Sequence, residues 1–246
     1  MQLENKLTIV TGAGRNIGAG IANRFANEGA KVAIVDILEE RTQAVADQIN
    51  ALHPGAALPI RCDVTNGGDV EAMVAEVVAK WGHIDTLINN VGVVDRTDIL
   101  NTTENEWDRV IATSLTSVFL VTKYVAQSMV NHAQGGRIIN ISSTSGHQGR
   151  PNATAYPAAK AGALHLARSL AMQLAPHNIR VNSITPNRVF TEAEPGAPAR
   201  SSSVENLIGR QITAEDIAGA CVYLAGPDGD SLTGADIFID GGVLAG

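Results

Sequence analysis

The sequence predicts an α/β protein with one doubly wound, seven-stranded parallel sheet. Short runs of apolar, mostly β-branched residues recur along the chain, and longer stretches with the amphipathic period of a helix separate them. The apolar runs do not alternate with polar residues, which indicates strands buried on both faces under helices. With 246 residues, 45% of them hydrophobic, the chain is long enough to bury a core without disulfides or metal ions.

Seven runs are predicted strands, at residues 7–10, 32–35, 58–61, 86–88, 137–141, 180–184 and 236–239. Six amphipathic stretches are predicted helices, at residues 17–28, 39–51, 68–80, 103–131, 156–175 and 214–225. Together these elements occupy nearly the whole chain and leave no room for a second domain. We therefore expect a single domain over residues 1–246.

One stretch, residues 190–206, has neither period. It reads FTEAEPGAPARSSSVEN, rich in Pro, Ala, Ser and Glu. A long segment without periodicity inside a compact domain is often a lid or a binding loop. We expect a short substrate lid here, and a surface insertion without a role at the site is the alternative.

Composition excludes several classes of protein. The net charge of −7 has the wrong sign for a nucleic-acid groove. Cys62 and Cys221 lie far apart in apolar contexts, so they predict buried side chains and neither a disulfide nor a metal site. The first residues, MQLENKLTIV, do not resemble a signal peptide, and no apolar run approaches the ~18 residues of a spanning helix. We expect a cytoplasmic protein with no membrane or nucleic-acid partner.

A glycine-rich loop, TGAGRNIGAG at residues 11–20, follows the first predicted strand and opens the first helix. Such a loop lets the backbone approach a pyrophosphate, which the free N–H groups of the helix then bind. The spacing fits T-G-x-x-x-G-x-G, with Gly12 and Gly18 in place and Asn16 where the middle glycine would stand. Asn tolerates positive φ better than other residues, so the loop can keep its shape. Arg15 and Ile17 complete the predicted cradle.

Asp36 ends the second predicted strand, 24 residues after Gly12. A carboxylate at this place accepts hydrogen bonds from adenosine ribose hydroxyls and repels a 2′-phosphate, which favours NAD over NADP. Arg15 is a signal in the other direction, because a basic side chain in the loop could pair with that phosphate. A helix-capping role for Asp36 is the structural alternative.

Tyr156 and Lys160, in YPAAK, lie one helical turn apart on the same face of a predicted helix. A free tyrosine has a pKa of about 10, and a nearby cation lowers it, so that the phenol can act as a general acid or base at neutral pH. Ser143, in NISSTSG, follows a predicted strand and could hydrogen-bond a substrate oxygen.

Taken in order, these features resemble the short-chain dehydrogenase/reductase family over the whole chain. The motifs that carry the resemblance are TGAGRNIG (11–18), Asp36, CDV (62–64), NNVG (89–92), Ser143, YPAAK (156–160), IRVNSITP (179–186) and IDGG (239–242). The resemblance implies a Rossmann-type fold and an NAD(H)-dependent oxidoreductase that interconverts a secondary alcohol and a ketone.

The resemblance also implies residue roles. Tyr156 would exchange the proton, Lys160 would bind the nicotinamide ribose and lower the pKa of Tyr156, and Ser143 would orient the substrate. Asp63 and Val64 would flank the adenine, with Asn90 and Gly92 lining the nucleotide cleft. The carboxamide would be held by the segment 186–191, which supplies Pro186, Asn187, Val189 and Thr191.

Three residues depart from the family pattern. Asn16 and Asn187 stand where glycine is usual, and for both we expect left-handed backbone. Ser114, in WDRVIATSL, stands where the family usually has an Asn that completes a proton relay. A serine can donate and accept but lacks the two ends of an amide, so we expect retained but slower chemistry. The alternative is that position 114 only shapes a helix kink.

The predicted substrate pocket has few aromatic residues, which favours a small polar substrate such as a hydroxy acid or a sugar-derived alcohol. Its candidate residues are Val93, Val94, Asp95, Ser145, His147, Gln148, Arg150 and Arg188. Arg150 or Arg188 could bind a carboxylate through two hydrogen bonds. Exposed loop residues paired with nearby acids are the alternative for each.

Two other functions stay open. The family resemblance implies that a 3-oxoacyl-(acyl-carrier-protein) reductase is possible, although Met172 stands where such reductases often have Arg and the net charge disfavours an acidic carrier. A nucleotide sensor that lost turnover is the alternative of another class. The helices at 103–131 and 156–175 carry more apolar surface than one sheet face should absorb. The family resemblance implies that these helices pair in a homo-oligomer, a dimer or tetramer, and ordinary packing on the sheet is the alternative.

Overall fold

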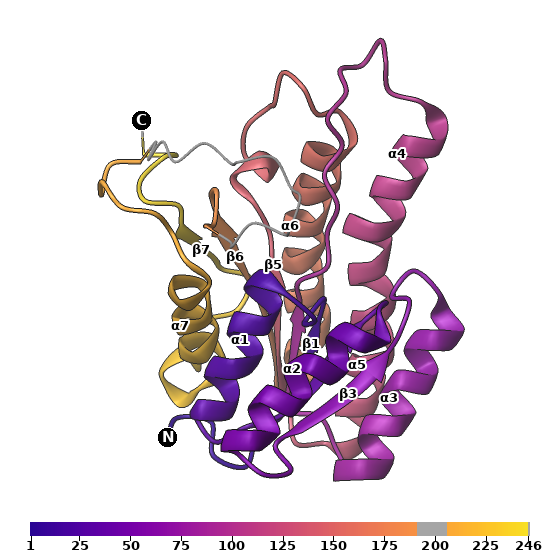
Figure 1. The fold of residues 1–246 in the computed structure, drawn as a ribbon, viewed down its shortest axis with the longest axis vertical. Helices are drawn as coiled ribbons and strands as arrows, with labels where there is room; N and C mark the ends of the chain where they lie inside the picture. The colour runs from indigo at the N-terminus through magenta and orange to yellow at the C-terminus, as the bar shows by residue number, and fades with distance from the viewer. Residues whose placement is uncertain (191–205, 246) are drawn as a thin grey trace.

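The computed structural model describes residues 1–190 and 206–245 and contains the predicted parallel sheet. Seven strands form one sheet in the order β3-β2-β1-β4-β5-β6-β7, and every neighbouring pair is parallel (Figure 1). The strands are β1 (Leu7–Thr11), β2 (Lys31–Asp36), β3 (Ala57–Arg61), β4 (Thr86–Asn89), β5 (Gly136–Ile141), β6 (Ile179–Pro186) and β7 (Asp236–Ile239). Each predicted strand is confirmed.

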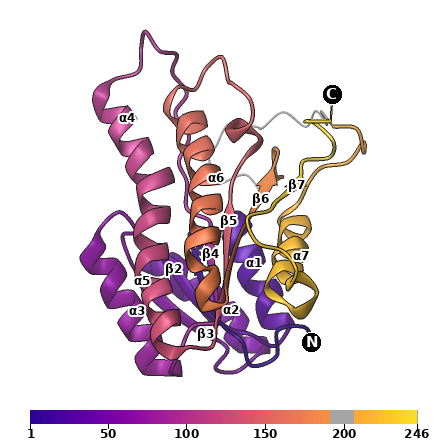
Figure 2. The ribbon, with the colours of Figure 1, turned by 180° about the vertical axis from the view of Figure 1, so that it is seen from behind.

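Helices cover both faces of the sheet, as Figures 1 and 2 show from opposite sides. Their bounds are α1 (Asn16–Asn27), α2 (Glu39–Leu52), α3 (Gly67–Trp81), α4 (Glu104–Ile111), α5 (Ser117–His132), α6 (Ala155–Leu174) and α7 (Ala214–Ala225). One core cluster joins α1, α2 and α7 to the sheet, and a second joins α3, α5 and α6 to its other face. In β1, Ile9 faces the second cluster and Val10 the first, which explains why the strands are apolar without alternation.

The predicted helix at 103–131 differs from the structure. It is divided into α4 and α5 by a π-helical turn, Ala112–Thr116, although the chain stays helical throughout. A π turn adds one residue to a single turn of the helix. The residues before and after it keep their helical spacing, so the sequence pattern predicts one continuous helix. Ser114 lies in the turn and is fully buried.

The stretch from Glu104 to His132 is long and apolar enough, by length and composition, to pass a test for a membrane-spanning helix. Core helices pass the same test. In α5, Val121, Val125 and Met129 are buried in the second core cluster, and this packing explains the apolar composition. The predicted lid, residues 190–206, lies mostly outside the described residues.

The strand order places a crevice at one edge of the sheet. The chain moves outward in one direction from β1 to β2 and β3, and in the other direction from β4 onward. The connections that follow β1 and β4 therefore diverge, and ligands of doubly wound sheets bind at such a point, beyond the carboxyl ends of the strands.

Candidate active site

A cleft of about 1270 Å³ lies at this carboxyl edge. Fourteen of the predicted cofactor-binding residues line it: Gly12, Arg15, Asn16, Ile17, Asp36, Asp63, Val64, Asn90, Gly92, Tyr156, Lys160, Pro186, Asn187 and Val189. Ser143 lines it too, whereas Gly18 and Ser114 do not. Thr191 lies outside the described residues. The motifs thus converge on one cavity.

The glycine loop has the shape that a phosphate cradle needs. Gly12 has φ +62° and Asn16 has φ 51°, so Asn16 does adopt the left-handed backbone that replaces a glycine. A Cβ on Gly18 would lie 2.2 Å from the carbonyl oxygen of Gly12, so Gly18 serves close packing between loop and helix. The first turn of α1 has no side-chain cap and no acidic residue, and its N–H groups can bind an anion.

Asp36 joins the loops that follow β1 and β2. Its carboxylate oxygens accept hydrogen bonds from the backbone N–H groups of Gly14 (3.2 Å) and Leu38 (3.3 Å). Arg15 and Arg41 line the same end of the site as Asp36. Sequence reasoning missed Arg41, and its signal was its place in the first turns of α2, five residues after Asp36.

Asn90 and Asp63 shape the cleft through backbone contacts. The side-chain amide of Asn90 donates to the carbonyl oxygens of Thr11 (3.0 Å) and Gly12 (3.2 Å), which holds the glycine loop against the end of β4. Asp63 accepts from the backbone N–H (2.9 Å) and the hydroxyl (2.7 Å) of Thr65, which closes the turn after β3.

Lys160 is buried at the inner end of the cleft. Its ammonium donates to the carbonyl oxygen of Ile141 (2.8 Å) and lies 5.7 Å from the ring centre of Tyr156. Burial lowers the pKa of Lys160 to about 8. A Cβ on Gly92 would lie 3.3 Å from the Lys160 ammonium, so a glycine there leaves the cation room.

The pKa of Tyr156 differs from expectation. Burial raises the pKa of the phenol, and a hydrogen bond with Ser143 and the charge of Arg150 lower it in part. The ammonium of Lys160 donates to the carbonyl oxygen of Ile141, and the prediction that it lowers the pKa of Tyr156 stays a prediction. The three side chains Ser143, Tyr156 and Lys160 line the same cleft, the first from the loop after β5 and the other two from α6.

Ser114 makes two hydrogen bonds with one residue. Its hydroxyl donates to the carbonyl oxygen of Val93 (3.1 Å) and accepts from the N–H of Val93 (3.0 Å). The short side chain therefore fastens the π turn to the loop after β4. This geometry supports a shaping role for Ser114 in the helix.

Asn187 lacks the left-handed backbone that we expected. Asn187 is not among the non-glycine residues with positive φ in the described part of the chain. Its side-chain oxygen instead accepts a hydrogen bond from the hydroxyl of Thr144 (3.1 Å). Asn187 thus connects the loop after β6 to the loop after β5, a tertiary contact that sequence could not reveal.

The predicted substrate residues separate into two groups. Arg188, Val93 and Val94 line the cleft, and the other five candidates do not: Asp95, Ser145, His147, Gln148 and Arg150. Arg150 donates to the hydroxyls of Ser145 and Thr144, at 3.0 Å each. His147 lies 2.8 Å from a carboxylate oxygen of Asp236 and packs on the ring of Phe238. The roles of these residues in binding stay predictions.

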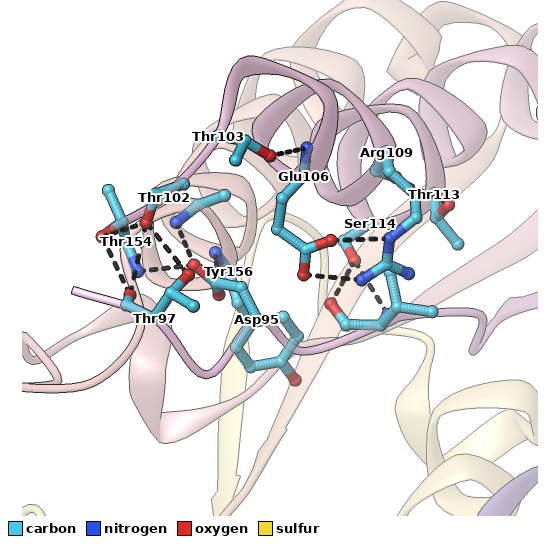
Figure 3. A network of polar contacts seen from close by, with 12 residues as sticks. Asp95, Thr97, Thr102, Thr103, Glu106, Arg109, Thr113, Ser114, Thr154 and Tyr156 are labelled. Atoms are coloured by element: carbon cyan, nitrogen blue, oxygen red, sulfur yellow. Dashed lines mark hydrogen bonds and ion pairs between the residues drawn. The ribbon is translucent and has the colours of Figure 1, made fainter. Parts of the chain in front are cut away.

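Sequence reasoning also missed other cleft residues, among them Arg96, Arg109 and Thr113. Arg109 and Thr113 lie four residues apart at the end of α4 and the start of the π turn, and Arg109 pairs with Glu106 (2.8 Å; Figure 3). The one available signal was that Ser114, already a candidate, lies beside Thr113 in sequence.

Comparisons with known proteins identify the family of the chain. A family model described as "Enoyl-(Acyl carrier protein) reductase" matches residues 12–244. Sorbitol dehydrogenase from Cereibacter sphaeroides is 34% identical over 98% of both chains. Trans-4-hydroxycyclohexanecarboxylate dehydrogenase from Sinomonas cyclohexanicum is 37% identical over 100% of this chain and 95% of its own.

A solved structure gives the same result. The crystal structure of 3-ketoacyl-(acyl-carrier-protein) reductase from Brucella melitensis complexed with NADH matches with a TM-score of 0.89 and 31% identity, over 98% of this chain and 99% of its own. The chain belongs to the short-chain dehydrogenase/reductase family.

Proposed function

We propose that this protein is an NAD(H)-dependent oxidoreductase that interconverts a secondary alcohol and a ketone on a small polar substrate. The observation that carries the proposal is the meeting of Ser143, Tyr156 and Lys160 in one cleft with the glycine loop and Asp36. When bound, the nicotinamide supplies or accepts a hydride at its C4. The protein must then manage one proton and the charge on the substrate oxygen.

Each of the three side chains has one task. The Tyr156 phenol gives the proton to the ketone oxygen in reduction and takes it from the alcohol in oxidation. The Ser143 hydroxyl, which lowers the pKa of the Tyr156 phenol, donates to the same substrate oxygen. Lys160 would bind the nicotinamide ribose. Turnover of a panel of alcohols and ketones, read as nicotinamide absorbance with Tyr156→Phe as control, tests the assignment; equal rates in the two proteins contradict it.

We infer a preference for NAD over NADP from Asp36. The Asp36 carboxylate would repel the 2′-phosphate of NADP. Arg15 and Arg41, which line the same end of the cleft, would attract that phosphate. The experiment compares kcat/KM for the two cofactors in the wild type and in Asp36→Ala. We expect wild-type preference for NAD and a loss of that preference in the variant. A wild type that prefers NADP would overturn this choice.

The substrate class rests on the lining and on the relatives. Arg188 is an exposed cation in the cleft, and a carboxylate is its natural partner. One relative is named for a polyol and another for a hydroxylated carboxylate. Turnover of a neutral alcohol and of its carboxylate analogue, measured in Arg188→Ala and Arg150→Ala, distinguishes a polyol from a hydroxylated carboxylate as the substrate class. Equal losses on both substrates exclude an anion-binding role.

A 3-oxoacyl-(acyl-carrier-protein) reductase is the second candidate function, because the Brucella melitensis neighbour carries that activity in its name. Met172, exposed on α6, offers no cation to an acidic carrier. Reduction of a carrier-bound 3-oxoacyl group at a rate above that of free substrates would favour it. Cofactor binding without any turnover would favour the nucleotide sensor.

We also propose that the protein is a cytoplasmic homo-oligomer, either a dimer or a tetramer.

A further inference from the structure

Helix α6, which carries Tyr156 and Lys160, has an unusual N-terminus. The first four N–H groups of a helix lack partners in the helix, and the N-cap side chain usually accepts one of them. The side chain of the N-cap residue, Thr154, caps nothing in α6. Its hydroxyl instead donates to the carbonyl oxygen of Thr97 (3.2 Å) and accepts from the hydroxyl of Thr102 (3.2 Å; Figure 3).

One distant carboxylate does the capping. Asp95 accepts from the N–H of Thr154 (2.6 Å) and Ala155 (2.8 Å) on one oxygen and from the N–H of Tyr156 (3.0 Å) on the other. The fourth position is Pro157, which has no N–H. Asp95, about 60 residues upstream, therefore satisfies every N–H group that the first turn leaves unpaired.

The surroundings keep Asp95 in place and charged. The residue is 1% exposed. Burial raises the pKa of its carboxyl, but the three backbone N–H groups of α6, together with the N–H of Asp95 itself, outweigh burial and hold the pKa below its usual value. Two residues before it, Val93 is fastened by Ser114, and two residues after it, Thr97 is bonded to Thr154. The carboxylate thus belongs to a loop held at both ends.

We propose that Asp95 is a positioning residue for the phenol of Tyr156, an inference that rests on the proposed function. Its bond reaches the backbone N–H of Tyr156 itself. Lys160, one turn further, is held separately by the carbonyl oxygen of Ile141. Loss of the Asp95 carboxylate would loosen the first turn and displace the phenol from Ser143, while the ammonium stays. Chemistry should suffer and cofactor binding should not.

The test is Asp95→Asn, with Asp98→Asn as matched control. Asp98 lies in the same loop, and its carboxylate accepts hydrogen bonds from Leu100 and Asn101 within its own turn. We expect kcat to fall roughly 10- to 100-fold in Asp95→Asn, because small displacements of reacting groups are costly. The Kd for NAD, measured by calorimetry, should stay at the wild-type value. Asp98→Asn should leave both values unchanged.

A double-mutant cycle distinguishes positioning from simple support of the fold. If Asp95 acts through Tyr156, adding Asp95→Asn to Tyr156→Phe should change the residual rate less than about twofold. Asp95→Ser, which keeps one acceptor, serves as a second variant if the Asn protein does not fold. A wild-type kcat in either folded variant, a parallel loss of NAD affinity, or additive losses in the cycle would overturn the proposal. Absence of turnover in the wild type would instead defeat the proposed function.

Discussion

At the scale of single residues, Ser114 is where the chain departs most from its family pattern. Two interpretations are open from the sequence: a weakened proton relay or a shaped helix. The hydroxyl donates one hydrogen bond to the backbone of Val93 and accepts another from it, and Ser114 is fully buried. A residue engaged in this way holds the π turn against the loop that carries Asp95. Its first effect is therefore on structure, and any effect on catalysis follows through that loop.

Ser114→Ala should lower the free energy of unfolding by about 1–3 kcal/mol, because it leaves the N–H and carbonyl of Val93 without a partner. Ser114→Asn should restore most of that loss, since an amide has both a donor and an acceptor. Urea denaturation of the three proteins measures this. Equal stability of the wild type and the Ala variant would show that the two bonds contribute nothing.

Lys160 gives a prediction about pH. Its pKa is lowered from 10.5 to about 8 by burial, so the unfolded chain binds more protons than the folded chain between these values. Stability of the wild type should therefore rise with pH across this interval, by about 3 kcal/mol from this group. Below pH 8 the buried charge is destabilising.

Lys160→Met removes that charge and serves as the comparison. The unfolding free energy of the variant, relative to the wild type, should fall as pH rises from 8 to about 10.5, where the cost of burying the cation disappears. Denaturation curves at several pH values measure the difference. A difference that is independent of pH would mean that Lys160 titrates normally in the folded protein.

At the scale of elements, the sequence predicts every strand because parallel strands buried on both faces form continuous apolar runs. Local spacing likewise placed Tyr156, Lys160 and Asp36 in the cleft. What local patterns could not provide is contact between distant segments. The capping of α6 by Asp95 and the bond between Thr144 and Asn187 depend on loops brought together by the sheet order.

Substitution of Gly18 tests the close packing of α1 against the glycine loop. A Cβ at this position would lie 2.2 Å from the carbonyl oxygen of Gly12, and backbone cannot yield cheaply, so Gly18→Ala should be destabilising and should weaken NAD binding. At Gly219, in α7, an added Cβ would meet nothing within 4 Å. Gly219→Ala should stabilise by about 0.5–1 kcal/mol, as alanine favours helix.

Thermal unfolding and calorimetry with NAD measure both variants. Comparing Gly18→Ala with Gly219→Ala separates the general effect of adding a methyl group to a helix from the specific effect of disturbing the glycine loop. A Gly18→Ala protein with wild-type Kd for NAD would contradict the close-packing role.

At the scale of the whole molecule, the strand order divides the cleft into two halves. The loops after β1, β2 and β3 supply the glycine loop, Asp36 and Asp63, and the loops after β4, β5 and β6 supply the catalytic side. Hydrogen bonds connect the elements of this catalytic half: Lys160 of α6 donates to the end of β5, and Asp95 accepts from the first turn of α6. The nucleotide half depends on backbone shape, whereas the catalytic half depends on a helix whose first turn is held from outside. The second half is therefore the more sensitive to distant changes.

The outer surface of α5 and α6 bears on assembly. The two helices lie side by side over one face of the sheet (Figure 2). Phe119 on α5 is 48% exposed and Met172 on α6 is 80% exposed, and large apolar side chains exposed on adjacent helices favour a partner surface. If this surface pairs two copies, Phe119→Glu should bury a charge without a partner there and weaken association at least about tenfold.

Light scattering after size-exclusion chromatography measures the mass of each protein across a range of concentrations. Leu52→Glu is the matched control, because Leu52 is also exposed (74%) but ends α2, which packs on the opposite face of the sheet. We expect the wild type and Leu52→Glu to share one oligomeric mass and Phe119→Glu to shift towards the monomer. A Phe119→Glu protein that keeps the wild-type mass at every concentration would place the interface elsewhere, and a monomeric wild type would remove the homo-oligomer from the proposed function.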